Sequence, residues 1–196
     1  MGLSHQLFGA RLLPIGTLYD PFITRGLDAL YHALYCGARF VVVATPSGVS
    51  LSPERAAHQS VITPGIGVAL PDLAYYEPAF AREVEWILLA GLRAVAERRE
   101  SLYLRLSTAP VDQRLALPAD DAHRAAVLAG GYRLTAARPV DGWNPDTVVH
   151  LFATGAVVPQ AIAAAQRLRE DGAFPSLFVV TSPDQLYRGL REPRPY

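Results

Sequence analysis

Strand-like and helix-like patterns alternate along the first half of the chain. Residues 40–44 (FVVVA) form an unbroken apolar run rich in β-branched side chains, which is typical of a strand buried on both faces of a parallel sheet. Strands are predicted at residues 11–18, 40–44, 66–70 and 101–107. Helices are predicted between them, over residues 21–36 and 78–98. Helices of this length between strands indicate crossover connections, so the fold class is α/β with a parallel sheet.

Each of the two helices has an apolar stripe with spacings of three and four residues, which predicts the face that packs on the sheet. In the first helix the predicted core residues are Leu27, Leu30, Tyr31, Leu34 and Tyr35. In the second they are Phe80, Val84, Ile87, Leu88, Gly91, Leu92 and Val95. Gly37 follows the first helix directly and is expected to end it.

The pattern fails over residues 108–129, which contain Pro110, Pro118 and the pair Asp120–Asp121. Strands return near 132–139, 147–155 and 174–182, with an alanine-rich helix over 157–172. We therefore expect a first domain over residues 1–110, a linker over 111–130 and a second domain over 131–196. The second domain alone is too small to close a sheet.

The loop after the run at 40–44 carries the most promising chemistry. Glu54 and His58 lie on it, just past the carboxyl end of a predicted buried strand, where ligands bind in open α/β sheets. Histidine titrates near neutrality and a nearby carboxylate orients it, so the pair is a candidate for acid/base catalysis or substrate binding. A solvated salt bridge in the loop is the alternative interpretation.

Composition excludes several kinds of chemistry. All 18 basic residues are arginine, which excludes lysine Schiff bases, the usual attachment of pyridoxal phosphate and a standard phosphate loop. The formal net charge is zero, so no general electrostatic field favours binding to nucleic acid or to an anionic membrane.

The single cysteine, Cys36, is predicted to be a small buried hydrophobe. With no signal sequence and no long apolar span, a soluble cytoplasmic protein is expected.

Neither a metal site nor a dinucleotide site is indicated. The five histidines have no ligand spacing, and His150 is expected to be structural in its strand. The glycines do not form a dinucleotide fingerprint.

Residues 18–60, beginning LYDPFITRGLDALYHALYCGARFVVVATPSG, resemble the pyrimidine-binding domain of thiamine-diphosphate enzymes of the transketolase superfamily. The similarity is greatest to the homodimeric decarboxylating component of pyruvate dehydrogenase complexes. YYEPAFAREVEWILLAGL resembles the next helix of that domain, and the segment from VVHLFATG to SPDQLYRGL resembles the start of the transketolase C-terminal domain. The ordered succession of these segments covers nearly the whole chain.

The resemblance implies roles for individual residues. His58 matches the histidine that reaches towards the cofactor and substrate, and Glu54 matches the acidic residue four positions before it. Tyr19 and Phe22 fall near the aromatic positions that contact the aminopyrimidine ring. Ser47 lies in the turn where transketolases carry a His-Asp pair, so a 2-oxoacid is expected in place of a sugar donor.

The sequence departs from the family in two respects that bear on catalysis. Arg55 follows Glu54 where the family has glycine, and it is expected either to clash there or to bind a substrate carboxylate. Residues 1–10 contain no acidic residue to match the glutamate that activates the aminopyrimidine ring, and no pyrophosphate domain with its magnesium ligands is present.

The resemblance therefore implies a subunit of a 2-oxoacid-decarboxylating enzyme with acyl transfer to a lipoyl or carrier-protein acceptor. It would be inactive alone and would form a homo- or hetero-oligomer with a subunit that supplies the pyrophosphate domain and Mg²⁺. The alternatives are a non-catalytic assembly module and an unrelated small-molecule-binding α/β domain. An incomplete sheet also exposes an edge, which favours association.

Overall fold

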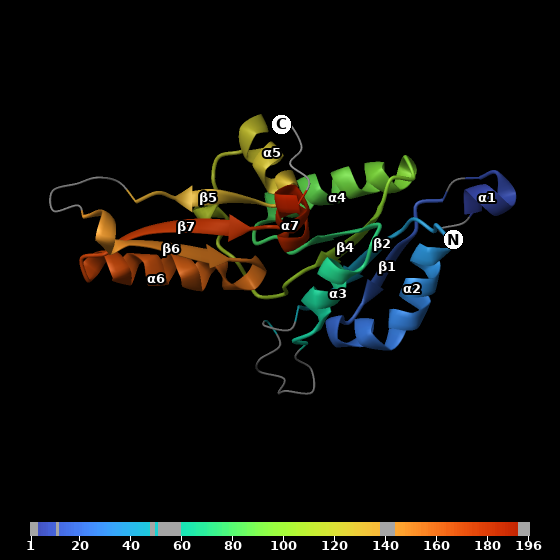
Figure 1. The fold of residues 1–196 in the computed structure, drawn as a ribbon, viewed down its shortest axis with the longest axis horizontal. Coiled ribbons are helices and arrows are strands. Elements are labelled where there is room, and N and C mark those ends of the chain that lie inside the picture. The colour runs from blue at the N-terminus through green and yellow to red at the C-terminus, as the bar shows by residue number, and fades with distance from the viewer. Residues whose placement is uncertain (1–3, 11, 48–49, 51–59, 138–143, 192–196) are drawn as a thin grey trace.

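In a computed structural model, the chain folds around two sheets that lie side by side along the long axis of the molecule (Figure 1). The structure describes residues 4–10, 12–47, 50, 60–137 and 144–191. The first sheet has the order β1-β2-β4-β3 and is parallel throughout. The second has the order β5-β7-β6, with β6 parallel and β5 antiparallel to β7. The predicted α/β class with a parallel sheet is confirmed.

The first sheet is built from short strands separated by helices. Its strands are β1 (Ile15–Leu18), β2 (Val41–Ala44), β3 (Leu73–Tyr76) and β4 (Ser101–Arg105). The helical segments of this half are α1 (Ser4–Phe8), the 3-10 helix η1 (Asp20–Gly26), α2 (Leu27–Tyr35), α3 (Thr63–Ala69) and α4 (Ala81–Ala96). Helices α2 and α3 cover one face of the sheet and α4 covers the other (Figure 1).

The second sheet consists of β5 (Gly131–Thr135), β6 (Val148–Ala153) and β7 (Phe174–Val180). Helix α6 (Val158–Glu170) packs on it, and α7 (Pro183–Arg191) packs against β3 of the first sheet. Short 3-10 turns occur at η4 (Gln113–Leu115), η5 (Pro145–Thr147) and η6 (Gly155–Val157). One apolar cluster joins Val41, Phe80 and Leu102 to Leu177 and Val179, so the two sheets share a core.

Residues 63–69 form helix α3, so the predicted strand over residues 66–70 is wrong. A short apolar run cannot be assigned to helix or strand by periodicity alone. Pro64 lies in the first turn of α3, where a proline is favourable. Gly67 lets α3 approach β3 closely, because a Cβ atom there would lie 2.4 Å from Cγ of Tyr75. The actual strand is β3, whose four residues are all buried.

Helix α5 (Asp121–Ala129) lies inside the stretch that was expected to be a linker without regular structure. Its signals are present in the sequence. Asp120 caps the helix by accepting a 2.7 Å hydrogen bond from the backbone N–H of His123, and Gly130 ends it with φ of 114°. The helix contacts both α4 and β5.

The apolar stripe predicted for α4 is confirmed, since Phe80, Ile87 and Val95 are buried. The apolar stripe predicted for α2 is largely wrong. Leu34 is buried, but Tyr31 is 59% exposed and Tyr35 is 85% exposed. Cys36, expected to be buried, is also exposed. In the described part of the chain, no helix combines the length and apolarity needed to cross a bilayer.

Candidate functional site at the strand ends

The carboxyl ends of the four parallel strands meet at one edge of the first sheet. Tyr19 and Asp20 follow β1, Ser47 follows β2 after two further residues, and Glu77 follows β3. Arg105 is the last residue of β4. This is the edge at which ligands bind in open α/β sheets.

Arg105 connects two carboxylates at this edge. Its Nε lies 3.1 Å from Oδ1 of Asp20 and its Nη2 lies 3.0 Å from Oδ2, which makes a two-point ion pair. Its Nη1 donates a 2.6 Å hydrogen bond to Oε2 of Glu77. Asp20, Glu77 and Arg105 are all buried, with exposed fractions of 0%, 7% and 3%. A buried charge is tolerated only when it is paired and hydrogen-bonded, and the three side chains satisfy that requirement together.

Hydroxyl groups complete the polar network. The Tyr75 hydroxyl donates a 2.5 Å hydrogen bond to Oε2 of Glu77. Thr63 donates to Oδ2 of Asp20 over 3.2 Å, and the Ser60 hydroxyl also donates to Asp20. We call Asp20, Ser60, Thr63, Tyr75, Glu77 and Arg105 the strand-end network.

The surroundings determine which protonation states are stable. Burial opposes the charge of Arg105, but the hydrogen bonds that Arg105 donates to Asp20 and the charge of Glu77 outweigh it and raise the pKa of the guanidinium. Burial, followed by the negative charge of Glu77, raises the pKa of the Tyr75 phenol. Burial and the charge of Asp20 likewise raise the pKa of Tyr103. The phenols therefore stay protonated and the guanidinium stays charged near neutral pH.

Glu77 also holds the first sheet to the second. Its N–H donates to the carbonyl of Thr181 over 2.8 Å, and its own carbonyl accepts from the N–H of Gly155 and the hydroxyl of Thr154, each over 3.2 Å. Gly155 has φ of +50°, and a Cβ atom there would lie 2.8 Å from Cγ of Glu77. The strand-end network and the contact between the two sheets therefore depend on the same residue.

Tyr19 and Phe22, the predicted cofactor contacts, lie together directly after β1. Their rings meet edge to face with centroids 5.4 Å apart, and Phe22 is 45% exposed. Cζ of Arg25 lies 4.5 Å from the centre of the Phe22 ring on its face, a cation–π contact. Their role with a cofactor stays a prediction.

Ser47, a predicted substrate contact, is only 2% exposed. Its N–H donates to the carbonyl of Leu106 over 2.7 Å, and its carbonyl accepts from the Ser50 hydroxyl over 2.7 Å. Ser47 therefore ties the segment after β2 to the end of β4. Its side chain is not presented to solvent, so direct contact with a substrate would require the structure to open.

The predicted catalytic residues Glu54 and His58 and the predicted substrate contact Arg55 lie outside the described residues. The residues that flank this segment are described on both sides. Ser50 is bonded to Ser47, and Ser60 is bonded to Asp20 of the strand-end network. Ser50 and Ser60 therefore lie near the carboxyl ends of the strands, and the placement of Glu54, Arg55 and His58 stays a prediction.

The described residues fit a thiamine cofactor only in part. The exposed ring surface of Phe22 could pack on an aromatic heterocycle, but Asp20 and Glu77, the carboxylates of the strand-end network, are already paired with Arg105. No group of three or more His, Cys, Asp or Glu side chains that could hold a metal ion occurs within the described ranges. No diphosphate-bound metal can be assigned to these residues.

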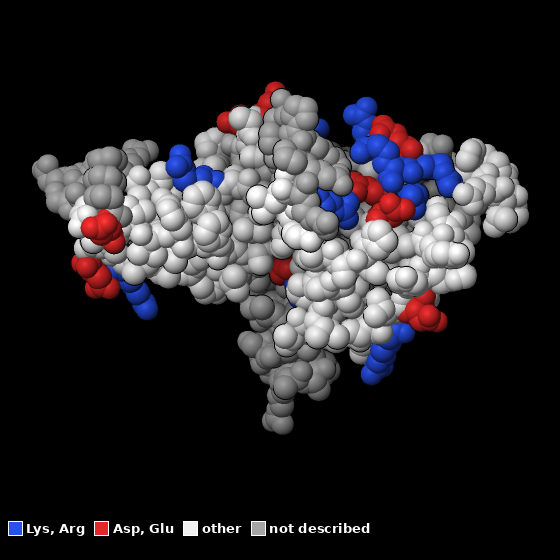
Figure 2. Space-filling view, in the orientation of Figure 1, with Lys and Arg blue, Asp and Glu red and all other residues white. Residues whose placement is uncertain are grey.

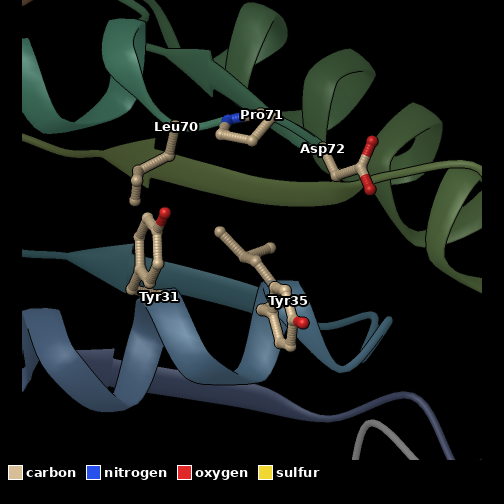
Figure 3. A pocket seen from close by; sticks show the side chains of 6 residues that line it. Tyr31, Tyr35, Leu70, Pro71 and Asp72 are labelled. Carbon is tan, nitrogen blue, oxygen red and sulfur yellow. The ribbon is translucent and has the colours of Figure 1, made fainter.

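Two surface cavities lie away from the strand ends. One, of about 200 Å³, is bounded by Tyr31 and Tyr35 of α2 and by residues 70–72 before β3, at the opposite end of that strand (Figure 3). Figure 3 shows Tyr31 extending from α2 towards Leu70. The other, of about 600 Å³, runs between α2 and strands β1 and β2.

The sequence predictions missed the strand-end network. A signal was available, since Arg105 ends a strand of buried residues and a buried arginine requires carboxylate partners. Asp20 directly precedes the helix predicted over residues 21–36, but its side chain is paired with Arg105. The partners could not be identified from spacing, because Asp20 and Glu77 lie 85 and 28 residues away.

No protein-family model matches the sequence. The chain is 27% identical over 170 residues to a pyruvate dehydrogenase E1 component from Mycobacterium tuberculosis, a match that covers 85% of this chain and 18% of that protein. The structure of this chain matches that of a transketolase from Campylobacter jejuni, with a TM-score of 0.71 and 16% sequence identity. The match covers 90% of this chain and 26% of the transketolase chain. The chain has a transketolase-type fold.

A second transketolase-type structure is closer in length. A split-gene transketolase, solved as an inactive β4 tetramer, matches with a TM-score of 0.65 and 19% identity, over 93% of this chain and 53% of that chain. The resemblance to the transketolase superfamily expected from the sequence is thus confirmed. The chain spans 18% of the length of the curated relative that it matches.

Proposed function

We propose that this chain is part of a thiamine-diphosphate-dependent enzyme that decarboxylates a 2-oxoacid, and that it supplies the pyrimidine side of the cofactor site. The observation that carries the proposal is the agreement of two comparisons. A transketolase-type fold extends over 90% of the chain, and the sequence match to a pyruvate dehydrogenase E1 component extends over 85% of it.

The roles of the residues are those that the resemblance to the transketolase superfamily implies. Tyr19 and Phe22 would pack against the cofactor ring, while His58 would transfer protons or orient the substrate with support from Glu54. Arg55 and Ser47 would contact the substrate, and the carboxylate of a 2-oxoacid would pair with Arg55. When bound, the cofactor supplies the stabilised carbanion that decarboxylation needs. Acyl transfer to a lipoyl or carrier-protein acceptor would complete the reaction.

A second polypeptide would supply what the described residues lack. The activating glutamate, the pyrophosphate domain and its Mg²⁺ are assigned to a partner subunit in a homo- or hetero-oligomer. The pairing of Asp20 and Glu77 with Arg105 supports this assignment, because activation of the ring by either carboxylate would require breaking a buried ion pair.

Within this proposal, residues 1–110 form a partial pyrimidine-binding domain and residues 131–196 the start of a C-terminal domain, with 111–130 between them. The continuous core and the hydrogen bonds of Glu77 indicate that the two parts behave as one folding unit. We place the protein in the cytoplasm.

A non-catalytic assembly module is the second candidate. It is favoured by the strand-end network, in which buried ion pairs occupy the edge of the sheet that would otherwise face a ligand. On this alternative the network serves only to hold the two sheets together, and the exposed ring of Phe22 has no ligand.

Calorimetric titration with thiamine diphosphate and Mg²⁺ distinguishes the two candidates. The purified chain is titrated alone and after mixing with a candidate pyrophosphate-domain subunit. The enzyme proposal predicts binding in the mixture that neither protein shows alone, and weaker binding with Phe22→Ala but not with the exposed control Leu89→Ala. If the assembled complex binds no cofactor, the assembly module is the better description.

A further inference from the structure

We propose that Asp20 is a positioning residue of the candidate site. Its carboxylate holds Ser60, the second residue after His58, and its backbone carries the aromatic pair of Tyr19 and Phe22. The inference rests on the proposed function, because it assigns the geometry of that same site to a buried side chain. The contacts that carry it lie in the interior of the described chain.

Ser60 is held by hydrogen bonds on two sides. Its hydroxyl donates to Oδ2 of Asp20 and accepts from the hydroxyl of Thr63 over 2.9 Å. The hydroxyl oxygen of Thr63 also lies 3.2 Å from the same Oδ2 atom, and Thr63 is fully buried. The three side chains form a closed group in which one carboxylate oxygen is the common acceptor. Ser60 is thereby attached to a residue that lies 40 positions earlier in the chain.

The acceptor itself has a fixed orientation. Arg105 holds both carboxylate oxygens of Asp20 in the two-point ion pair, and the Tyr103 hydroxyl lies 3.5 Å from Oδ1. On the face shown in Figure 2, charged side chains gather near α4 and few lie over α2 and α3, whereas Asp20 is wholly buried. A buried carboxylate that is held at two points cannot turn away from Ser60 without breaking its ion pair, so it provides a rigid anchor.

Asp20 also belongs to the turn that carries the predicted cofactor contacts. It is the first residue of η1, directly after Tyr19 and two residues before Phe22. The N–H of Phe22 donates to the carbonyl of Tyr19 over 2.8 Å, so the turn is tight, and the two rings contact each other. Asp20 thus connects the aromatic pair, through its backbone, with Ser60, through its side chain.

Stability alone is a weak reason for the contact between Asp20 and Ser60. Arg105 already pairs with Asp20, and one further hydrogen bond from a hydroxyl adds little to the free energy of folding. The geometry of a reacting site is far more sensitive, since a displacement of about 1 Å can lower a rate about 100-fold. Loss of the Ser60 hydroxyl is therefore expected to affect turnover much more than global stability.

Limited proteolysis of the purified chain tests the contact without any cofactor. Arg55 is the only arginine between Arg39 and Arg82 in a chain without lysine, so tryptic cleavage there is identified from the masses of the fragments. Ser60→Ala should raise the rate of cleavage after Arg55 by roughly fivefold, the equilibrium effect expected from one net hydrogen bond. Ser60→Thr keeps a hydroxyl and should restore the wild-type rate. Equal rates for the wild type and Ser60→Ala would overturn the proposal.

Turnover of the assembled enzyme tests the positioning role itself. After assembly with the pyrophosphate-domain subunit, Ser60→Ala should lower kcat for the 2-oxoacid by roughly 10- to 100-fold, while the Kd for thiamine diphosphate stays within about threefold of the wild type. Ser60→Thr should recover kcat. Thr147→Ala is the matched control, because it removes a 2.8 Å hydroxyl hydrogen bond to the carbonyl of Asn144 and should change neither constant. Circular dichroism of each variant establishes that its fold is retained.

The outcomes separate the positioning role from the proposed function. If the wild-type complex turns over a 2-oxoacid and the Ser60→Ala complex does so equally fast, the positioning role is overturned and the proposed function stands. If the wild-type complex neither binds the cofactor nor turns over a 2-oxoacid, the proposed function fails and the positioning role fails with it. Proteolysis of the chain alone still shows in that case whether Asp20 anchors Ser60.

Discussion

Arg105 and Asp20 form a two-point ion pair in the interior, with N···O distances of 3.0 and 3.1 Å, although 85 residues separate them in the chain. The same guanidinium binds Glu77 over 2.6 Å. The ends of three strands are thus joined by one side chain. Since Glu77 also bonds the second sheet, loss of Arg105 is expected to affect the whole molecule.

Arg105→Met should destabilise the protein by about 3–5 kcal/mol, because it leaves two buried carboxylates without their cation. Urea unfolding followed by circular dichroism measures the change. The matched control is Arg82→Met, which breaks an ion pair between half-exposed side chains, Arg82 and Glu85, and should cost at most about 1 kcal/mol. Equal effects of the two substitutions would show that the strand-end network is not a source of stability.

Gly155→Ala should lower the free energy of unfolding by about 2 kcal/mol or more. The residue has φ of +50°, and the new methyl group would lie 2.8 Å from Cγ of a Glu77 side chain that Arg105 holds in place. Gly172→Ala is the control, since Gly172 has φ of +84° but nothing within 4 Å of the added methyl group. The difference between the two variants isolates the contact with Glu77. If both variants lose the same free energy of unfolding, backbone strain accounts for both losses.

Stability should fall steeply in alkaline solution. Burial, followed by the charges of Glu77 and Glu83 respectively, raises the pKa of the phenols of Tyr75 and Tyr132. The folded protein keeps these protons where the unfolded chain releases them, near an ordinary pKa of about 10. Their contribution to stability is therefore fully present below about pH 10 and is lost as the pH rises further.

Urea unfolding at a series of alkaline pH values measures this loss. Tyr132→Phe should show a shallower fall in stability with pH than the wild type, because it removes one phenol of raised pKa. Tyr35→Phe, at a position that is 85% exposed, is the control. A Tyr132→Phe profile parallel to that of the wild type would contradict the expectation.

His58→Ala should lower the decarboxylation rate of the reconstituted enzyme by roughly 100- to 10,000-fold, the usual contribution of a general acid or base. Turnover of the 2-oxoacid is measured after assembly with the pyrophosphate-domain subunit. His150→Ala, at an exposed position on β6, is the control. If the His58 variant assembles normally and its turnover is unchanged, His58 has no catalytic role.

Much of the fold was predictable from local patterns. The apolar run at 40–44 and the stripe of α4 predicted a buried parallel strand and its covering helix. Burial on both faces of a strand leaves a continuous apolar run, and burial of one face of a helix leaves a periodic stripe. The strand predicted at 66–70 failed because a five-residue apolar run is compatible with both helix and strand. The exposure of Tyr31 and Tyr35 could not be predicted, because periodicity identifies an apolar face but not whether another element covers it.

The sequence by itself determined the α/β class, the absence of lysine chemistry and the resemblance to thiamine-diphosphate enzymes, because these depend on composition and on the order of local segments. Only the tertiary structure decided which charges meet. Asp20, Glu77 and Arg105 come from three segments that parallel pairing brings to one edge of the sheet. It also decided that residues 182–188 cover the edge of β3, since the edge of a sheet depends on strand order, which local sequence does not encode.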